Sequence, residues 1–114
     1  MVELTLQIPN SLAQQIQPIT NWLPTIIELS VTNFKSLQVK KASDELIGFL
    51  SNNPTPQKVL KYKISDKSQN RVSELLSANG ERTLNSIEEK ELDEWSKFNH
   101  ICIMLSAQTL KLTK

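Results

Sequence analysis

Residue types that carry chemistry are sparse in this chain, which has one histidine and one cysteine. His100 and Cys102 are two residues apart, so a helix would place them on different faces. No second histidine or cysteine is present to complete a zinc site. Cys102 lies in the apolar run 101–105, where an inert buried thiol is expected rather than a nucleophile. We therefore expect no metal ion, no cofactor and no enzyme activity.

The other candidate for chemistry is an acidic cluster at residues 88–94, Glu-Glu-Lys-Glu-Leu-Asp-Glu. Paired carboxylates can act as acid and base or hold a metal ion, but such sites require burial. This cluster instead opens a predicted helix, where acidic side chains complement the helix dipole. The two glycines, Gly48 and Gly80, are too far apart for a phosphate-binding loop. We interpret the cluster as a solvated helix face.

The element that positions these residues is a long helix predicted over residues 86–112. Ser86 and Glu89 have the spacing of a capping box, and apolar residues then recur every three or four positions. Over 101–105 the apolar character spreads around the helix, so this half must be covered on more than one side. We expect a partner protein to supply part of that cover. The predicted partner-binding residues are Trp95, Phe98, Ile101, Met104 and Leu105.

Residues 1–35 are predicted to form a dimerisation segment that consists of a strand and two helices. Apolar and polar residues alternate from Val2 to Ile8, and Pro9 ends the pattern. A lone strand has no ladder partner within the chain, so we expect it to pair with the same strand of a second copy. The order of strand, helix and helix is that of a ribbon-helix-helix homodimer.

The remainder is predicted to be a basic linker with a short helix, residues 36–56, followed by a helical hairpin, residues 57–114. The short helix is expected at 44–50, because the residues before it are polar and basic with no clear period. The hairpin pairs a helix at 66–78 antiparallel with the long last helix, burying Trp95. Ala78-Asn79-Gly80 would supply the left-handed cap between them. The predicted fold class is therefore mainly α, with one N-terminal β-strand, short helices and a C-terminal antiparallel hairpin.

Charge is distributed unevenly along the 114 residues, although the net charge is only +1. Residues 35–71 carry eight lysines and arginines against three acids, whereas 1–34 and 72–114 each have a net charge of −2. No run approaches the roughly 18 apolar residues of a membrane span. A single cysteine agrees with a reducing compartment, so we expect a cytoplasmic protein.

A DNA-binding transcriptional regulator is the alternative function. Thr5 and Gln7 would lie on the exposed face of the paired ribbon in the major groove. Lys35, Lys40 and Lys41 would then have to contact the phosphates, because residues 1–34 contain no lysine or arginine. This missing charge argues against the DNA-binding alternative.

Four stretches resemble a family of short, mostly uncharacterised proteins of cyanobacteria and related filamentous bacteria. They lie at residues 4–13, at 23–29, at 49–50 together with 53–60, and at 88–94; the Pro-Thr-Pro-Gln text within the third is fairly specific, while the opening strand and helices are common to many small bacterial regulators. Members of the family look like antitoxin or accessory components associated with nuclease partners. The resemblance implies an antitoxin-like function and a toxin or nuclease as the partner. The chain departs from the family text at residues 77–82.

Overall fold

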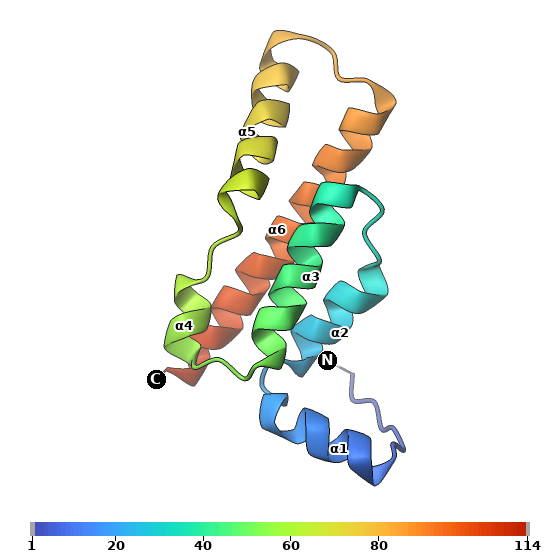
Figure 1. Ribbon diagram of the computed structural model, residues 1–114, viewed down its shortest axis with the longest axis vertical. Coiled ribbons are helices and arrows are strands. Elements are labelled where there is room, and N and C mark those ends of the chain that lie inside the picture. Colours follow the sequence, from blue (N-terminus) through green and yellow to red (C-terminus); the bar gives the residue numbers. More distant parts are fainter. Residues whose placement is uncertain (1, 114) are drawn as a thin grey trace.

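The computed structural model describes residues 2–113, and these form six α-helices and one turn of 3-10 helix, η1 (Figure 1). The mainly α class predicted from the sequence is confirmed. The elements, in chain order, are α1 Asn10–Ile16, η1 Gln17–Ile19, α2 Leu23–Thr32, α3 Leu37–Ser51, α4 Pro56–Lys61, α5 Asp66–Glu81 and α6 Ser86–Leu112.

Helix α6 runs along the long axis of the molecule, and α2, α3, α4 and α5 all pack against it (Figure 1). Helices α4 and α5 follow one another along one side of it, and α2 and α3 pack against the other side. Helix α5 joins α6 through residues 82–85 and runs in the opposite direction. The core takes buried side chains from each of the three predicted segments, for example Trp22, Val39 and Val59. No helix among the described residues is long and apolar enough to span a membrane.

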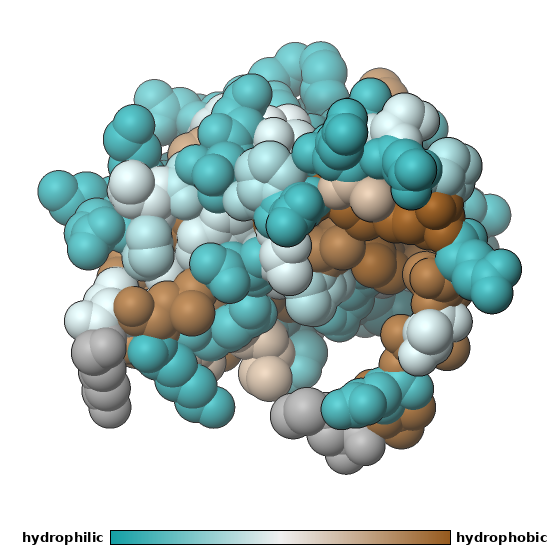
Figure 2. Space-filling model, turned by 90° about the horizontal axis from the view of Figure 1, so that it is seen from below, coloured by the Kyte–Doolittle hydropathy of each residue, from teal (hydrophilic) through white to brown (hydrophobic). Residues whose placement is uncertain are grey.

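The N-terminal strand predicted over residues 2–8 is not seen, because these residues form no regular secondary structure. Val2, Leu4 and Leu6 are 90%, 82% and 67% exposed. A strand requires a ladder partner, and no other part of the described chain forms a backbone hydrogen bond with residues 2–8. The next helix, α1, buries none of its side chains. Seen from the α1 end, the molecule exposes hydrophobic side chains among hydrophilic ones (Figure 2).

The predicted linker over residues 36–43 is wrong, because α3 is one continuous helix of 15 residues. Its buried side chains recur every three or four residues at Val39, Ala42, Leu46 and Leu50, each no more than 1% exposed. The charged residues around them hid this period in the sequence. The short helix expected at 44–50 is the second half of α3.

The predicted caps of the last two helices are also wrong. Helix α5 continues through Gly80 to Glu81, and no glycine of the described chain has a positive φ. The N-cap of α6 is Asn85 rather than Ser86: Asn85 Oδ1 accepts from the Glu88 N–H at 2.8 Å, and the Glu88 carboxylate accepts from the Asn85 N–H at 3.1 Å. The capping box therefore exists one residue earlier than the sequence pattern indicated. The bounds predicted for α6 are confirmed.

Candidate functional site

The surface of the protein has an apolar groove of about 650 Å³. One wall is α6, from Leu92 to Ser106. The opposite wall consists of Val59 of α4, α5 from Gln69 to Leu76 and the connector between these helices, residues 62–65. Leu46 of α3 also lines the groove. We call this feature the α5–α6 groove.

Three of the five predicted partner-binding residues lie together in the α5–α6 groove. Trp95, Phe98 and Leu105 line it while remaining only 4%, 2% and 5% exposed. The rings of Trp95 and Phe98 pack edge to face with centroids 6.0 Å apart, which holds both in place. The groove is therefore an opening onto the protein's own core.

The structure does not place the other two predicted residues in the groove. Ile101 is 3% exposed and packs within the core. Met104 is 56% exposed. At about 100° per residue, Met104 lies about 140° around α6 from Asn99, which lines the groove. Met104 therefore belongs to a different face of the molecule.

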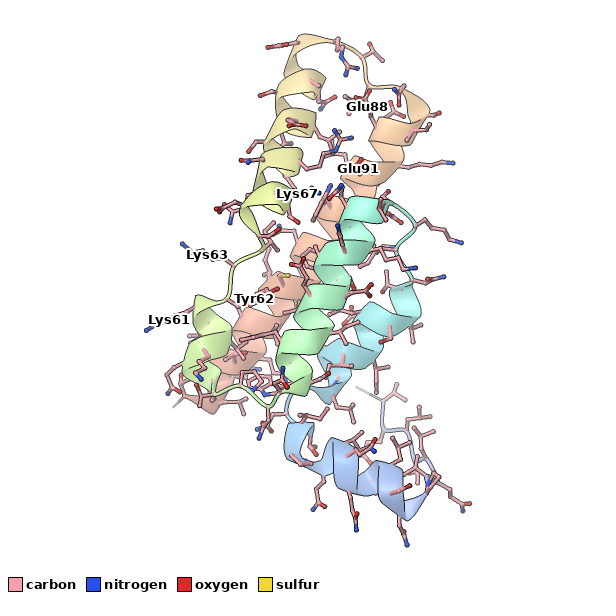
Figure 3. The ribbon with its side chains drawn as sticks, viewed as in Figure 1. Lys61, Tyr62, Lys63, Lys67, Glu88 and Glu91 are labelled. Carbon is pink, nitrogen blue, oxygen red and sulfur yellow. The ribbon has the colours of Figure 1, made fainter. Side chains whose placement is uncertain are left out.

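The connector forms the opposite wall by alternating its side chains. Tyr62 and Ile64 are half-buried and line the groove, whereas Lys61 and Lys63 are exposed. Figure 3 shows the two lysines pointing away from the helical body and Tyr62 pointing inward. The Tyr62 ring stacks on Phe49 with centroids 4.6 Å apart. This extended segment presents an apolar inner surface and a basic outer one.

The open edge of the groove on α6 is lined by small neutral polar residues, Ser96, Asn99 and Ser106. Cys102 lies between them and is half-buried. Burial raises the pKa of the Cys102 thiol to about 11, so the thiol is protonated at neutral pH. His100 is exposed and is not among the residues that line the groove. These groups can donate and accept hydrogen bonds, but they include no activated nucleophile.

The acidic cluster is not wholly a solvated face, because Glu91 is only 7% exposed. Its carboxylate accepts two hydrogen bonds of 2.8 Å from the guanidinium of Arg71 and one of 3.1 Å from the Trp95 indole N–H. The hydrogen bonds from Arg71, helped by the one from Trp95, lower the pKa of Glu91. Glu91 thus fixes α5 against α6 and orients Trp95 at the groove.

Glu94 joins α6 to the start of α3. Its two carboxylate oxygens accept hydrogen bonds from the backbone N–H groups of Lys35 and Ser36, at 2.8 and 2.7 Å. Desolvation opposes ionisation of Glu94, but the hydrogen bonds from Lys35 and Ser36 outweigh it and lower its pKa. Glu94 therefore holds the loop between α2 and α3 on α6.

Glu88, in the first turn of α6, links this helix to the C-terminal end of α5. It pairs with Arg82 through two hydrogen bonds of 2.9 and 2.8 Å. These bonds, with the one from the Asn85 N–H, lower the pKa of Glu88 to about 2.

No three histidine, cysteine or acidic side chains of residues 2–113 are grouped so as to hold a metal ion.

The residues predicted to contact DNA lie on two separate elements. Thr5 and Gln7 are exposed in the irregular N-terminal segment. Lys35 lies in the loop before α3, and Lys40 and Lys41 are exposed on α3 itself. Within residues 2–113 the Lys35 backbone is hydrogen-bonded to Glu94, so α6 positions this loop.

Comparison of the chain with protein-family models, with curated proteins and with solved structures gave no significant match.

Sequence reasoning missed Tyr62 and Ile64 as members of the site. The signal was present, because Lys61-Tyr62-Lys63-Ile64 alternates charged and apolar side chains as a half-buried extended segment does. It was overlooked because four residues are too few to stand out between two helices.

Proposed function

We propose that this chain is a non-enzymatic, antitoxin-like protein-binding module that holds a segment of a partner protein in the α5–α6 groove. The observation that carries the proposal is the apolar groove whose floor is formed by Trp95, Phe98 and Leu105. Ligand sites are typically concave and apolar, with a few polar groups that set orientation. Ser96 and Asn99 supply such groups at the edge.

The energetics of recognition also favour a protein ligand. A groove whose walls are rigid before binding loses little entropy when a partner fills it. Trp95 is held by Phe98 and by its hydrogen bond to Glu91, so it is ordered in the free protein. The groove also lacks a nucleophile paired with a base, which supports binding rather than catalysis.

We propose further that residues 2–8 pair with the same segment of a second copy to form a homodimer. The supporting observations are the exposed alternate residues Val2, Leu4 and Leu6 and the backbone groups that lack partners within the described chain. Pairing would supply both a hydrogen-bond ladder and a cover for the apolar side chains.

Filling the groove tests the proposed function. Asn99 lines the groove and is exposed, so Asn99→Trp places a bulky ring there without disturbing the core. Tagged protein expressed at native levels should capture a partner, expected to be a toxin or nuclease and identified by mass spectrometry. Asn99→Trp should lose that partner while keeping its melting temperature within a few degrees. Unchanged capture by Asn99→Trp would rule out the groove as the binding site.

DNA binding is a second proposal, favoured by one observation. Residues 2–8 are open to solvent, and pairing two copies through this segment would put Thr5 and Gln7 on the face opposite Leu4 and Leu6. Lys40 and Lys41 are exposed as well. A gel shift with the DNA upstream of the protein's own gene, at two salt concentrations, tests the idea. A DNA complex must weaken as salt rises, and absence of any salt-sensitive shift would remove this alternative.

A further inference from the structure

We propose that Asn79 is a site of spontaneous modification, at which the side-chain amide is converted to a carboxylate through a cyclic imide formed with Gly80. The inference concerns the covalent chemistry at the end of α5 and does not depend on the proposed function. It follows from the residue after Asn79, from the exposure of the last turn of α5, and from the way in which Asn85 is held.

The reaction uses only the chain and water. The backbone nitrogen of Gly80 attacks Cγ of Asn79 and closes a succinimide ring. The side-chain nitrogen leaves as ammonia and carries away the proton that the Gly80 nitrogen loses. Water then adds to one of the two ring carbonyls: opening the ring at Cγ gives aspartate, and opening it at the backbone carbonyl gives isoaspartate, whose main chain runs through the side chain. Neither step oxidises or reduces any group.

The residue that follows Asn79 favours this reaction. Among the nine asparagines of the chain, Asn79 alone precedes a glycine. Glycine has no Cβ beside its nitrogen, and its backbone reaches conformations that other residues rarely adopt, so the nitrogen can approach Cγ. Asn53 precedes a proline, whose nitrogen has no hydrogen to lose. The other seven asparagines precede residues that carry a side chain.

The position of Asn79 exposes it to the reaction. An intact α-helix opposes ring closure, because it fixes the backbone and uses the Gly80 N–H as a hydrogen-bond donor. Residues 79–82 are all exposed, and the last buried side chain of α5 is Leu75, one turn earlier. The end of α5 lies at the tip of the molecule, beyond α2, α3 and α4 (Figure 1). This turn can therefore open while the rest of the fold stays intact.

The sequence of this turn also gives it little helical stability. Glycine is a weak helix former. The last turn of α5 contains Glu81 and no basic residue, the reverse of what the helix dipole favours. Gly80 does not supply a left-handed cap, since no glycine of residues 2–113 has a positive φ. The ion pair of Arg82 with Glu88 is formed by side chains and does not hold Asn79 or Gly80.

Asn85 provides a contrast within the same hairpin. It precedes serine, which is smaller than most of the residues that follow the other asparagines. Its side chain is held, because Asn85 Oδ1 accepts a hydrogen bond of 2.8 Å from the Glu88 N–H as the N-cap of α6. Turning Asn85 Cγ toward the Ser86 nitrogen would break the capping box. The structure therefore favours modification at Asn79 and protects Asn85.

Modification should weaken the end of α5. A carboxylate at position 79 adds negative charge beside Glu81, where the helix dipole disfavours it. Isoaspartate also lengthens the main chain, so the hydrogen-bond pattern of the helix cannot continue through it. Aged protein should melt about 1–4 °C below fresh protein, and Asn79→Asp should reproduce part of that fall.

Peptide mapping of the folded full-length protein tests the inference. Trypsin cleaves after Arg71, Arg82 and Lys90, so residues 72–82 contain Asn79 as their one asparagine and residues 83–90 contain Asn85. After incubation at mildly alkaline pH, mass spectrometry should show the acid form accumulating at least about tenfold faster in 72–82 than in 83–90. Chromatography should resolve aspartate and isoaspartate forms of 72–82. Equal rates in the two peptides, or no conversion of Asn79, would overturn the inference.

Two matched glycine substitutions separate local opening from global unfolding. Gly80→Ala and Gly48→Ala each add a methyl group at a helical position where no heavy atom lies within 4 Å, so both should fold and melt slightly higher. Gly80→Ala should slow conversion of Asn79 at least about tenfold, because the methyl group hinders the nitrogen and strengthens the turn. It should also keep its melting temperature on ageing. Gly48→Ala, in α3, should convert at the unmodified rate. Equal slowing by Gly48→Ala would mean that the whole protein must unfold first, and would overturn the inference.

Discussion

The two halves of α6 are held in place by different forces. From Ser86 to Phe98 three glutamates reach across to other elements: Glu88 to Arg82, Glu91 to Arg71, and Glu94 to the backbone before α3. From Asn99 to Leu112 such contacts are few, and buried Ile101 and Leu105 provide the packing. The first half combines directed polar contacts with the buried rings of Trp95 and Phe98. The second half relies on apolar burial, with a hydrogen bond from Gln108 to the Asn21 carbonyl as its directed contact to another element of the described chain.

The α5–α6 groove lies across the boundary between the two halves of α6, because its α6 wall runs from Leu92 to Ser106. Hydrogen-bonded carboxylates specify the angle and register of α5 on α6, while apolar packing leaves side chains such as Ile103, 56% exposed, at the surface. Trp95 takes part in both kinds of contact, because it is buried in the core and its indole N–H donates a hydrogen bond to Glu91. We call the contacts of Glu88, Glu91 and Glu94 the polar regime. Substitutions that remove a buried apolar side chain and substitutions that weaken the polar regime should therefore lower the stability of the protein by different amounts.

The largest expected effect is that of Trp95→Ala, which removes the side chain at this junction. Loss of a buried indole should lower the free energy of unfolding by about 3–5 kcal/mol, enough to unfold a marginal small domain. Chemical denaturation followed by circular dichroism measures it. Met104→Ala is the control, because Met104 is 56% exposed and its truncation should cost less than about 0.5 kcal/mol. Equal stability of the two variants would contradict the burial of Trp95.

An intermediate effect is expected when the polar regime alone is weakened. Glu91→Gln removes the charge that faces Arg71 and should cost about 1–2 kcal/mol, because the pair is partly shielded while Arg71 stays about a third exposed. Denaturant titration of Glu91→Gln beside Glu89→Gln, whose side chain is exposed on the same helix, provides the comparison. If both variants matched the unmodified protein, the carboxylates would not position α5.

The sequence allowed α6 and the mainly α class to be predicted because their signals are long and repeated. A period that recurs over 27 residues survives local exceptions, and α6 ends where that period ends. Burial of Trp95 followed from its place in that stripe. In α3 the same reasoning failed, because Lys40 and Lys41 interrupt a period that only Val39, Ala42 and Leu46 reveal.

The groove itself could not be predicted from the sequence, because it is formed by residues far apart in the chain. Tyr62 and Leu105 line the same groove only because the connector between α4 and α5 is extended. The apolar character of residues 101–105 indicated that this part of α6 is covered. It did not indicate which faces of the helix the chain itself covers. That is why Ile101 was predicted to bind a partner and is instead part of the core.

The polar regime also predicts a dependence on pH. The pKa values of Glu88, Glu91 and Glu94 are lowered in the folded protein, that of Glu88 from 4.5 to about 2. A lowered pKa gives stability that is complete above about pH 4.5 and is lost as the pH falls toward 2. Thermal melts should show Tm falling across that range.

The control for this pH effect is a variant that lacks one of the three carboxylates. Glu88→Gln should start with a lower Tm at neutral pH and lose less of it between pH 4.5 and 2. A Tm that stays constant over this range in the unmodified protein would show that the three carboxylates do not stabilise the first half of α6.

The smallest effect on stability is expected at the exposed surface of the second half. Met104→Asp should change the free energy of unfolding by less than about 0.5 kcal/mol and leave partner capture intact, because Met104 faces away from the groove. Capture of the partner is measured for Met104→Asp and for Asn99→Trp in the same assay. Loss of the partner in Met104→Asp, with capture retained in Asn99→Trp, would move the binding surface to the other side of α6.

The most direct test of the groove as the binding site is a titration of the isotope-labelled protein with the captured partner, followed by two-dimensional NMR. The account predicts that the largest shifts occur at the backbone amides of Asn99 and Ser106 on the α6 wall and of Tyr62 on the opposite wall. Signals from residues 2–16 and from Met104 should stay in place. Shifts confined to residues 2–16 or to Met104, with the groove signals unchanged, would contradict it.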